Sequence, residues 1–447
     1  MTARIMGCRT EWTGPLFVWR VALTIQIVWI SGCGGTTQVP PVQATRDPAV
    51  VSNVEVNEEA MNQWNTANDA FAREAAAGWG RANCQQVDRL YEEANAAQGH
   101  AFTESIYMRG VVARECGDIG SATSFFLKAL EVNSGFCKAR AAIGLIRLDE
   151  GDEVEALSAF NKALEDDPRC TEAYLNRSIV SWRRGAPAQE VLNDIRRALA
   201  IESDFLPAFN QMALLYFRMA RDEGDDRRLD LAEVVCRQAQ LLDRDYAPIY
   251  NTWGLIKIER NDVIEALRMF ERAKQLDNDM FEAFMNFGQM TLSFRGYADA
   301  RQSFARAVEL EPESYDAIIG LGAAYRGERN YQDAQRQYER AIELDASRPE
   351  AYFNLGLLWQ DYMSGSIEDL NRATDFYEQF LAKSQGQDSF ASAVEAVNRN
   401  CTQARGRRRS SDCRPGRLQL IQDTVSVLEE VQALQREAEG LQSEVDQ

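Results

Sequence analysis

Residues 137–170, CKARAAIGLIRLDEGDEVEALSAFNKALEDDPRC, decide the fold of this 447-residue chain. The stretch carries a glycine at Gly144, small residues at Ala156 and Ala163, the aromatic Phe160 between them, and a proline two residues before its end. Small residues let two helices cross closely, an aromatic side chain fills the space between units, and a proline ends a helix. The stretch therefore predicts two short helices packed against each other.

The same pattern recurs along the chain with a period of 34 residues. One column holds the glycines Gly110, Gly144, Gly254, Gly288, Gly322 and Gly356. Two further columns hold the alanines Ala122, Ala156, Ala266, Ala300 and Ala334, and Ala129, Ala163, Ala273, Ala307 and Ala341. Between them stand the aromatics Phe126, Phe160, Phe270, Phe304 and Tyr338. This pattern resembles the tetratricopeptide repeat (TPR), which implies an all-α superhelical solenoid of helix-turn-helix units.

The register predicts an array over residues 57–386, with a degenerate N-terminal cap at 57–98. The complete units are expected at 103–136, 137–170, 171–205, 206–246, 247–280, 281–314, 315–348 and 349–385. The third of these departs from the pattern, with Ser178 in the glycine column. The fourth contains a charged insertion at 221–226, which we expect to lengthen the connection between its helices, and the last has an insertion at 363–369.

Composition excludes several classes of function. Asp and Glu number 68 against 49 Lys and Arg, a net charge of −19, which is unsuited to binding nucleic acid through its phosphates. The single histidine, His100, rules out catalytic triads and multi-histidine metal sites. No Cys-x-x-Cys pair is present to bind zinc. We predict a protein that is not an enzyme and that has no metal or cofactor.

The N-terminal segment, residues 1–32, has the features of an export signal. Three arginines and one acid precede an apolar stretch at 21–30, which is too short to span a membrane. Ile30-Ser31-Gly32-Cys33 then resembles the bacterial lipobox, which implies cleavage before Cys33 and lipid attachment to its thiol. The alternative is an ordinary signal peptide with a chance cysteine. Gly34 rather than Asp after the cysteine favours the outer membrane, facing the periplasm, over the inner membrane, and residues 33–56 are expected to form a flexible tether.

A concave face lined by the first helix of each unit is the predicted binding groove. In this family certain columns of the repeat line the groove. In this chain those columns hold Leu214, Phe217, Leu255, Ile258, Met285, Leu292, Ile319, Phe353 and Leu357. Such a groove suits an apolar peptide or an amphipathic helix. The alternative is that these side chains pack internally between helices.

The cysteines fit an exported chain, because disulfides persist in oxidising compartments. The repeat register predicts a bond between Cys84 and Cys116 and another between Cys137 and Cys170, whereas Cys236 takes an aromatic's place in the core and is expected to stay reduced. A third pair, Cys401 with Cys413, is a further candidate. The alternative is that all seven cysteines after Cys33 are reduced.

The C-terminal residues differ from the repeats. We predict a capping helix at 387–400, an arginine-rich loop at 401–417 and an amphipathic or coiled-coil helix at 418–447. The loop's basic patch consists of Arg405, Arg407, Arg408, Arg409, Arg414 and Arg417. It is either a site for lipid phosphates or an acidic partner, or a solvated loop. Apolar residues recur every seven positions in the last segment, as Leu420, Val427, Leu434 and Leu441, so that this helix either docks on the array or associates with a second copy.

Together these features predict a membrane-anchored periplasmic scaffold or adaptor that binds other cell-envelope proteins. The layout of lipobox, eight or nine units and tail resembles the gliding-motility TPR lipoproteins of myxobacteria. The alternatives are a pilotin-like assembly factor for a type IV pilus secretin and an activator of a cell-wall enzyme.

Overall fold

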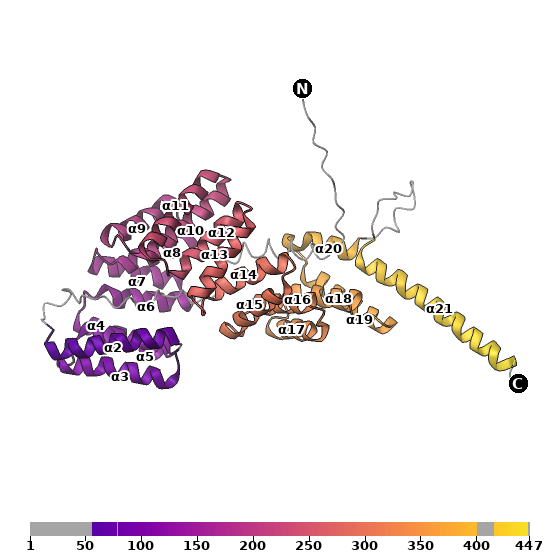
Figure 1. Ribbon diagram of the computed structural model, residues 1–447, viewed down its shortest axis with the longest axis horizontal. Coiled ribbons are helices and arrows are strands. Elements are labelled where there is room, and N and C mark those ends of the chain that lie inside the picture. The colour runs from indigo at the N-terminus through magenta and orange to yellow at the C-terminus, as the bar shows by residue number, and fades with distance from the viewer. Residues whose placement is uncertain (1–55, 78, 400–414, 446–447) are drawn as a thin grey trace, which may run out of the picture. The chain divides into compact units, whose positions relative to one another are not determined.

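The computed structural model describes residues 56–77, 79–399 and 415–445. These residues form twenty α-helices and one short 3-10 helix and contain no strand, so the predicted all-α fold is confirmed (Figure 1). The chain divides into two compact units, here called the N-terminal unit, which ends at Asp262, and the C-terminal unit, which begins at Val263.

The N-terminal unit is a series of antiparallel helix pairs in which every helix packs on the next. Its helices are α2 (Glu58–Ala77), α3 (Arg81–Ala97), α4 (Thr103–Glu115), α5 (Ile119–Val132), α6 (Cys137–Asp149), α7 (Glu153–Asp166), α8 (Thr171–Arg183), α9 (Ala188–Ile201), α10 (Leu206–Glu223), α11 (Asp226–Leu242) and α12 (Ala247–Glu259).

The C-terminal unit continues the helical pairs and ends in a long helix. Its elements are α13 (Val263–Leu276), α14 (Phe281–Ser293), α15 (Tyr297–Leu310), α16 (Tyr315–Gly327), α17 (Tyr331–Leu344), α18 (Glu350–Asp361), α19 (Ile367–Lys383), the 3-10 helix η2 (Asp388–Phe390), α20 (Ala391–Asn398) and α21 (Arg417–Val445).

A residue in the left-handed region turns the chain between the two helices of many repeats. Glycine occupies this position in three N-terminal repeats, at Gly117, Gly151 and Gly185, with φ between 79° and 83°. Arg295 and Arg329 adopt the same conformation in later repeats, with φ of 62° and 64°. Because a Cβ atom is strained there, the arginine turns cost free energy that the glycine turns do not.

The glycine column exists because the glycines contact the aromatic rings. A Cβ built on Gly144 would lie 2.6 Å from Cε1 of Phe160, and one built on Gly322 would lie 2.6 Å from Cε1 of Tyr338. Both rings are fully buried. Tight contact of this kind leaves no room for a methyl group, so the close crossing of the two helices requires glycine.

Two repeats that lack the glycine also lack the aromatic. Where Ser178 replaces glycine, the buried residue in the aromatic column is Ile195, and where Ala213 replaces it, the partner column holds Cys236. The hydroxyl of Ser178 donates to the carbonyl of Leu175 at 2.6 Å, so that this buried polar group is satisfied. A larger residue in one column is thus matched by a smaller one in the other, and the core volume is preserved.

The charged insertion at 221–226 does not lengthen a loop, contrary to the expectation from sequence. It extends α10 to 18 residues and α11 to 17, whereas α6 and α7 have 13 and 14. Only Gly224, with φ of 65°, and Asp225, whose carboxylate accepts from the backbone N–H of Arg227, separate the two helices. The charged side chains of Asp222, Glu223, Asp226 and Arg227 in the added turns are exposed.

The last repeat is covered by the C-terminal elements. Phe390 of η2, Val397 of α20 and Ile421 of α21 are buried in the same cluster as Tyr377 and Phe380 of α19. An array of repeats needs such a cover over its last apolar surface.

Candidate functional site

The first helices of successive repeats form one layer of the array. In the N-terminal unit α6 contacts α8, α8 contacts α10, and α10 contacts α12; in the C-terminal unit α14 contacts α16 and α16 contacts α18. We call the side chains at positions 2, 5, 9 and 12 of each repeat the first-helix face. In a repeat superhelix this layer is the concave binding surface.

In the N-terminal unit this face carries a line of half-buried apolar side chains, the apolar strip. Its members are Ile179 and Trp182 of α8, Leu214 of α10, and Leu255 and Ile258 of α12. Since half-buried apolar groups still lose water when a partner covers them, the strip is a suitable surface for an apolar peptide.

Two members of the strip were missed by the sequence interpretation. Ile179 and Trp182 stand 35 residues before Leu214 and Phe217, in the same two columns. The repeat at 171–205 departs from the period by one residue, which hides this correspondence. Aligning the columns with that extra residue would have identified both.

Phe217 does not belong to the strip, contrary to prediction. Its side chain is 4% exposed and is one of the buried residues of α10, so it cannot line a groove. The guanidinium of Arg221 lies 5.8 Å from the centre of its ring. Arg221, which lies in the part of α10 that the charged insertion adds, is thus one of the groups beside this ring.

Arginines flank the strip at the ends of the first helices. This arginine flank consists of Arg114, Arg183, Arg218 and Arg221. Burial, together with the charges of Arg183 and Arg221, lowers the pKa of the Arg218 guanidinium to about 10. The charges of Arg183 and Arg221 thus act on Arg218, whereas Arg114 pairs with Glu115 at 2.9 Å and Arg221 also lies 3.9 Å from Glu259. Cations gathered beside an apolar surface favour a partner with acidic residues.

The opposite ends of the same helices carry a mixed cluster with an excess of acids. Lys138 of α6 pairs with Glu172 of α8 at 3.0 Å, and this carboxylate is the main cause of the raised pKa of Lys138. Burial raises the pKa of Glu104 and of Glu202, and Lys138 partly opposes both shifts. The face is therefore polarised, with carboxylates at one end of the helices and guanidinium groups at the other.

In the C-terminal unit, three of the five predicted groove residues are half-buried and two are buried. Met285, Leu292 and Ile319 are half-buried and pack against core clusters of their own unit. Phe353 and Leu357 are 7% and 5% exposed, so the structure corrects their assignment to the groove. Phe353 packs against the rings of Tyr377 and Phe380 instead, because the next pair of helices covers it.

Two disulfides join consecutive repeats in the N-terminal unit. Cys84 in the first turn of α3 is bonded to Cys116 at the end of α4, with 6.2 Å between their Cα atoms. Cys137 at the start of α6 is bonded to Cys170 directly before α8, at 6.0 Å. Both separations are usual for disulfides, and the pairs are those expected from the repeat register.

The remaining cysteine of the described residues is a core residue. Cys236 is fully buried in α11, and burial raises the pKa of its thiol well above the usual range. A thiol that stays protonated and inaccessible is unreactive.

Several predicted site residues lie outside the described residues. They are Cys33, Cys401, Cys413, Arg405, Arg407, Arg408, Arg409 and Arg414. Arg417 is described and is half-buried. Its guanidinium pairs with Asp361 at 3.0 Å and donates to the amide oxygen of Gln360 at 2.8 Å, so this member of the predicted basic patch holds α21 against α18.

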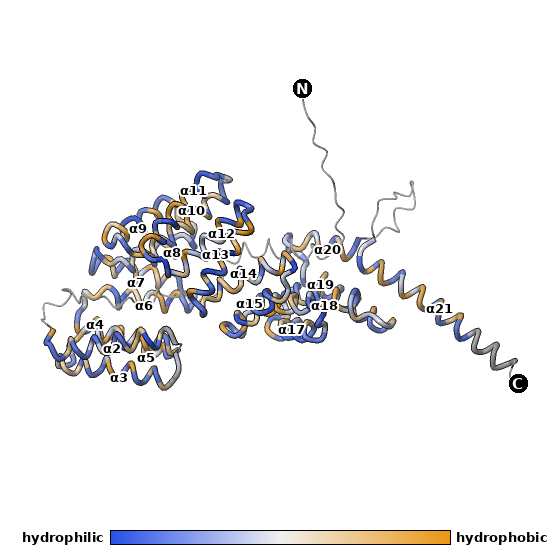
Figure 2. The backbone as a smooth tube through the Cα atoms, viewed as in Figure 1, coloured by the Kyte–Doolittle hydropathy of each residue, from blue (hydrophilic) through white to orange (hydrophobic). Residues whose placement is uncertain are grey.

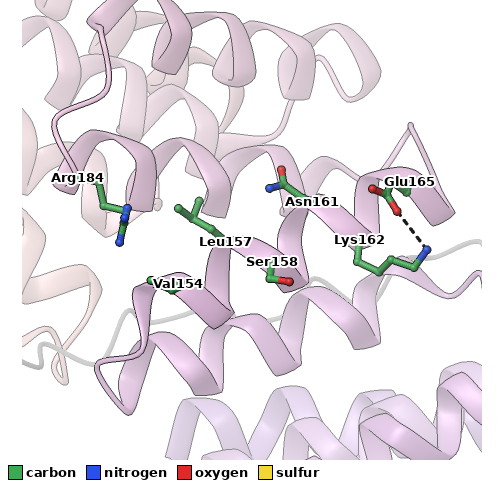
Figure 3. A pocket seen from close by; sticks show the side chains of 7 residues that line it. All are labelled: Val154, Leu157, Ser158, Asn161, Lys162, Glu165 and Arg184. Atoms are coloured by element: carbon green, nitrogen blue, oxygen red, sulfur yellow. Dashed lines mark hydrogen bonds and ion pairs between the residues drawn. The ribbon is translucent and has the colours of Figure 1, made fainter.

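A shallow hollow of about 410 Å³ lies over α7 beside the end of α8 (Figure 3). Its lining residues are Val154, Leu157, Ser158, Asn161, Lys162, Glu165 and Arg184. Lys162 pairs with Glu165 at 3.1 Å, and the amide oxygen of Asn161 accepts from Arg177 at 2.9 Å. Since the walls contain no histidine or cysteine and these polar groups are engaged, the hollow is not a candidate catalytic site.

The described residues, 56–77, 79–399 and 415–445, lack two kinds of feature. No helix there has both the length and the apolar character needed to cross a bilayer. No group of three or more His, Cys, Asp or Glu side chains there is placed to hold a metal ion.

Comparison with known proteins finds the repeat family. A family model described as tetratricopeptide repeat matches residues 141–204 and 319–361. No curated protein sequence matches the chain. Among solved structures, a thermophilic TPR protein of Thermus thermophilus is 21% identical and covers 42% of this chain and 99% of its own, with a TM-score of 0.39.

Two larger structures are also similar in fold. Yeast Tom70 is 17% identical over 77% of this chain and 69% of its own, with a TM-score of 0.47. The Cut9–Hcn1 tetramer of the APC/C is 13% identical over 66% of this chain and 55% of its own, with a TM-score of 0.49. These likenesses concern the fold alone. The matching family model and the columns of glycine, alanine and aromatic residues show that this chain contains tetratricopeptide repeats, a repeat that mediates protein–protein interactions.

Proposed function

We propose that this protein is a lipid-anchored scaffold of the bacterial cell envelope that holds a partner protein on the first-helix face of its N-terminal unit. The observation that carries the proposal is the apolar strip bordered by the arginine flank. Apolar side chains that remain half-exposed across three successive first helices favour an extended or helical partner segment, and the adjacent cations favour a segment with acidic residues.

The disulfides support the proposed compartment. Two bonds that each tie one repeat to the next are typical of proteins in an oxidising environment such as the periplasm. With the lipobox-like sequence ending at Cys33, this favours an exported, acylated chain. A motility machinery of the envelope is the proposed system, because the layout resembles gliding-motility lipoproteins.

Partner capture tests the binding surface. The amount of envelope protein that co-purifies with the chain carrying Leu214→Glu and Leu255→Glu should be at least tenfold lower than with the wild type. The reason is that two carboxylates would replace apolar contacts in the strip. The matched control is Val234→Glu with Leu241→Glu on α11, whose side chains are 51% and 76% exposed. Both pairs add the same charge, and circular dichroism checks that both variants remain helical. Equal capture by both pairs would refute the proposed surface.

Fractionation tests the anchor. Cys33→Ala should release the protein from the outer-membrane fraction or leave it unprocessed, whereas Cys236→Ala should not change its location. If the Cys33 variant stays with the outer membrane at the wild-type level, the protein is not held by a lipid on this residue.

A further inference from the structure

Helix α21 has two apolar faces, and only one of them is used within the chain. The first face consists of Leu418, Ile421, Val425 and Leu428, which pack in the cluster formed with α19 and α20. Ile421 is 2% exposed, and the Arg417–Asp361 ion pair fixes the start of the helix. This face accounts for the docking of the helix on its own array.

The second face, which we call the seam, points away from that cluster. Its described members Leu420, Val427, Val431 and Leu434 are 44%, 59%, 44% and 60% exposed. At 100° per residue they lie about 120° around the helix from the docked face. Figure 1 shows α21 as one continuous helix, and Figure 2 shows hydrophobic residues recurring along it.

The seam continues in the sequence beyond the docked part of the helix. All residues from 429 to 436 are exposed, so nothing in the described chain covers Val431 or Leu434. Ala438, Leu441 and Val445 extend the alternating spacing of three and four residues to the end of the helix. A spacing of 3.5 residues on average fits another helix with the same spacing.

The charges beside the seam favour a second copy in parallel orientation. The positions on one side are all acidic: Asp423, Glu430, Glu437 and Glu444. Those on the other side are uncharged: Ile421 and Leu428, which belong to the docked face, and Gln435 and Gln442 beyond it. Two parallel copies in register place Glu430 and Glu437 of one copy opposite Gln435 and Gln442 of the other, whereas two antiparallel copies place acids opposite acids. The same acids oppose contact with an anionic membrane surface.

We propose that residues 420–445 form a parallel two-stranded coiled coil with the same segment of a second copy, while the first face of each α21 stays docked on its own array. The protein is then a dimer with two first-helix faces. Because the helices are acidic, with Arg436 the single cation between residues 429 and 445, added salt should tighten the dimer rather than weaken it.

Sedimentation velocity on the full chain tests the proposal. All proteins carry Cys33→Ala to keep them free of lipid. The parent should dimerise, and Val427→Glu with Leu434→Glu should raise the dissociation constant at least tenfold. The matched control, Gln422→Glu with Gln432→Glu, adds the same charge at exposed positions outside the seam and should remain dimeric. A parent that stays monomeric at about 100 μM, or a seam variant that dimerises like the control, overturns the proposal.

A cysteine at the end of the seam tests orientation. Leu441→Cys should form a disulfide between two copies upon oxidation, because in-register parallel helices place residue 441 beside itself. Antiparallel helices would place it near residue 424, and no such dimer would form. Failure to cross-link while the chain is dimeric, or a cross-link to a different protein in cells, overturns the parallel homodimer.

Discussion

The repeats at 81–185 and those at 281–361 share one core and differ in how they are secured. Both pack a glycine on a buried aromatic ring, as Gly144 on Phe160 and Gly322 on Tyr338. The earlier repeats add two disulfides and use glycine in their turns, whereas the later repeats have no disulfide among the described residues and place Arg295 and Arg329 in strained turns. Repeats with equivalent packing therefore need not have equal stability, because in a linear array each unit depends mainly on itself and its neighbours.

Removal of the disulfides should cause the largest change in the stability of the earlier repeats relative to the later ones. Cys84→Ala with Cys116→Ala, or Cys137→Ala with Cys170→Ala, opens a loop of 32 or 33 residues. In the chain-entropy account each bond contributes about 3–4 kcal/mol to the free energy of unfolding. Hydrogen exchange should show faster opening of the helices from α3 to α8 and unchanged exchange in α14–α18. Unchanged exchange in α3–α8 would show that packing alone secures these repeats.

Because the two regions share one core, replacing the core glycine should lower the free energy of unfolding equally in both. Gly144→Ala and Gly322→Ala each place a methyl group 2.6 Å from a buried ring and should each lower the free energy of unfolding of their repeat by about 1–3 kcal/mol. Urea unfolding followed by hydrogen exchange measures both. Gly120→Ala is the control, because its nearest neighbour atom lies 3.7 Å from the new Cβ. A cost at only one of the two sites would break the equivalence of the cores.

An ion-pair network replaces covalent bonds in the later repeats. Arg348 contacts Asp316 at 2.8 Å and Glu350 at 2.8 Å, and lies 3.9 Å above the ring of Tyr315. Arg348→Met should cost about 1–2 kcal/mol in the free energy of unfolding, since half-buried carboxylates lose a charged donor. Arg336→Met, an exposed pair within α17, should cost almost nothing. Equal losses for both variants would show that the network has no special role.

The later repeats should also gain stability in mild acid. Burial raises the pKa of Glu311 and of Asp316 in these repeats. A carboxyl whose pKa rises on folding binds protons more tightly when folded. The free energy of unfolding therefore falls as pH rises from the ordinary carboxyl pKa through the raised one, and it recovers on acidification. Unfolding between pH 7 and pH 5 measures this, and Glu311→Gln should reduce the slope; an unchanged slope would remove Glu311 from the explanation.

The turns should give the smallest effect. Arg329→Gly removes the strain of an arginine in the left-handed conformation, but glycine is also more flexible in the unfolded chain. The net result should be an increase of about 0.5 kcal/mol in the free energy of unfolding. The reverse change in the earlier repeats, Gly151→Arg, should lower it by a similar amount. Thermal unfolding detects both shifts, and a destabilised Arg329→Gly variant would mean that the arginine side chain contributes more than its backbone costs.

The sequence located the helices that carry the proposed binding surface, but it did not predict correctly which of their side chains line it. The columns placed Leu214, Leu255 and Ile258 on the first helices, where they are half-buried. The same columns placed Phe217 there, but its side chain is buried. Trp182 was not predicted to line the surface because its repeat is one residue longer than the period.

The sequence by itself determined the repeat, because the contact between a glycine and an aromatic ring is made within one pair of helices. It also placed the four bonded cysteines at equivalent ends of adjacent helices. Only the tertiary structure decided which apolar residues remain accessible and how α21 divides its two faces. Exposure of Phe353 or Leu420 depends on helices that follow or precede it by many residues, and a periodic pattern records which residues share a face without recording what covers that face.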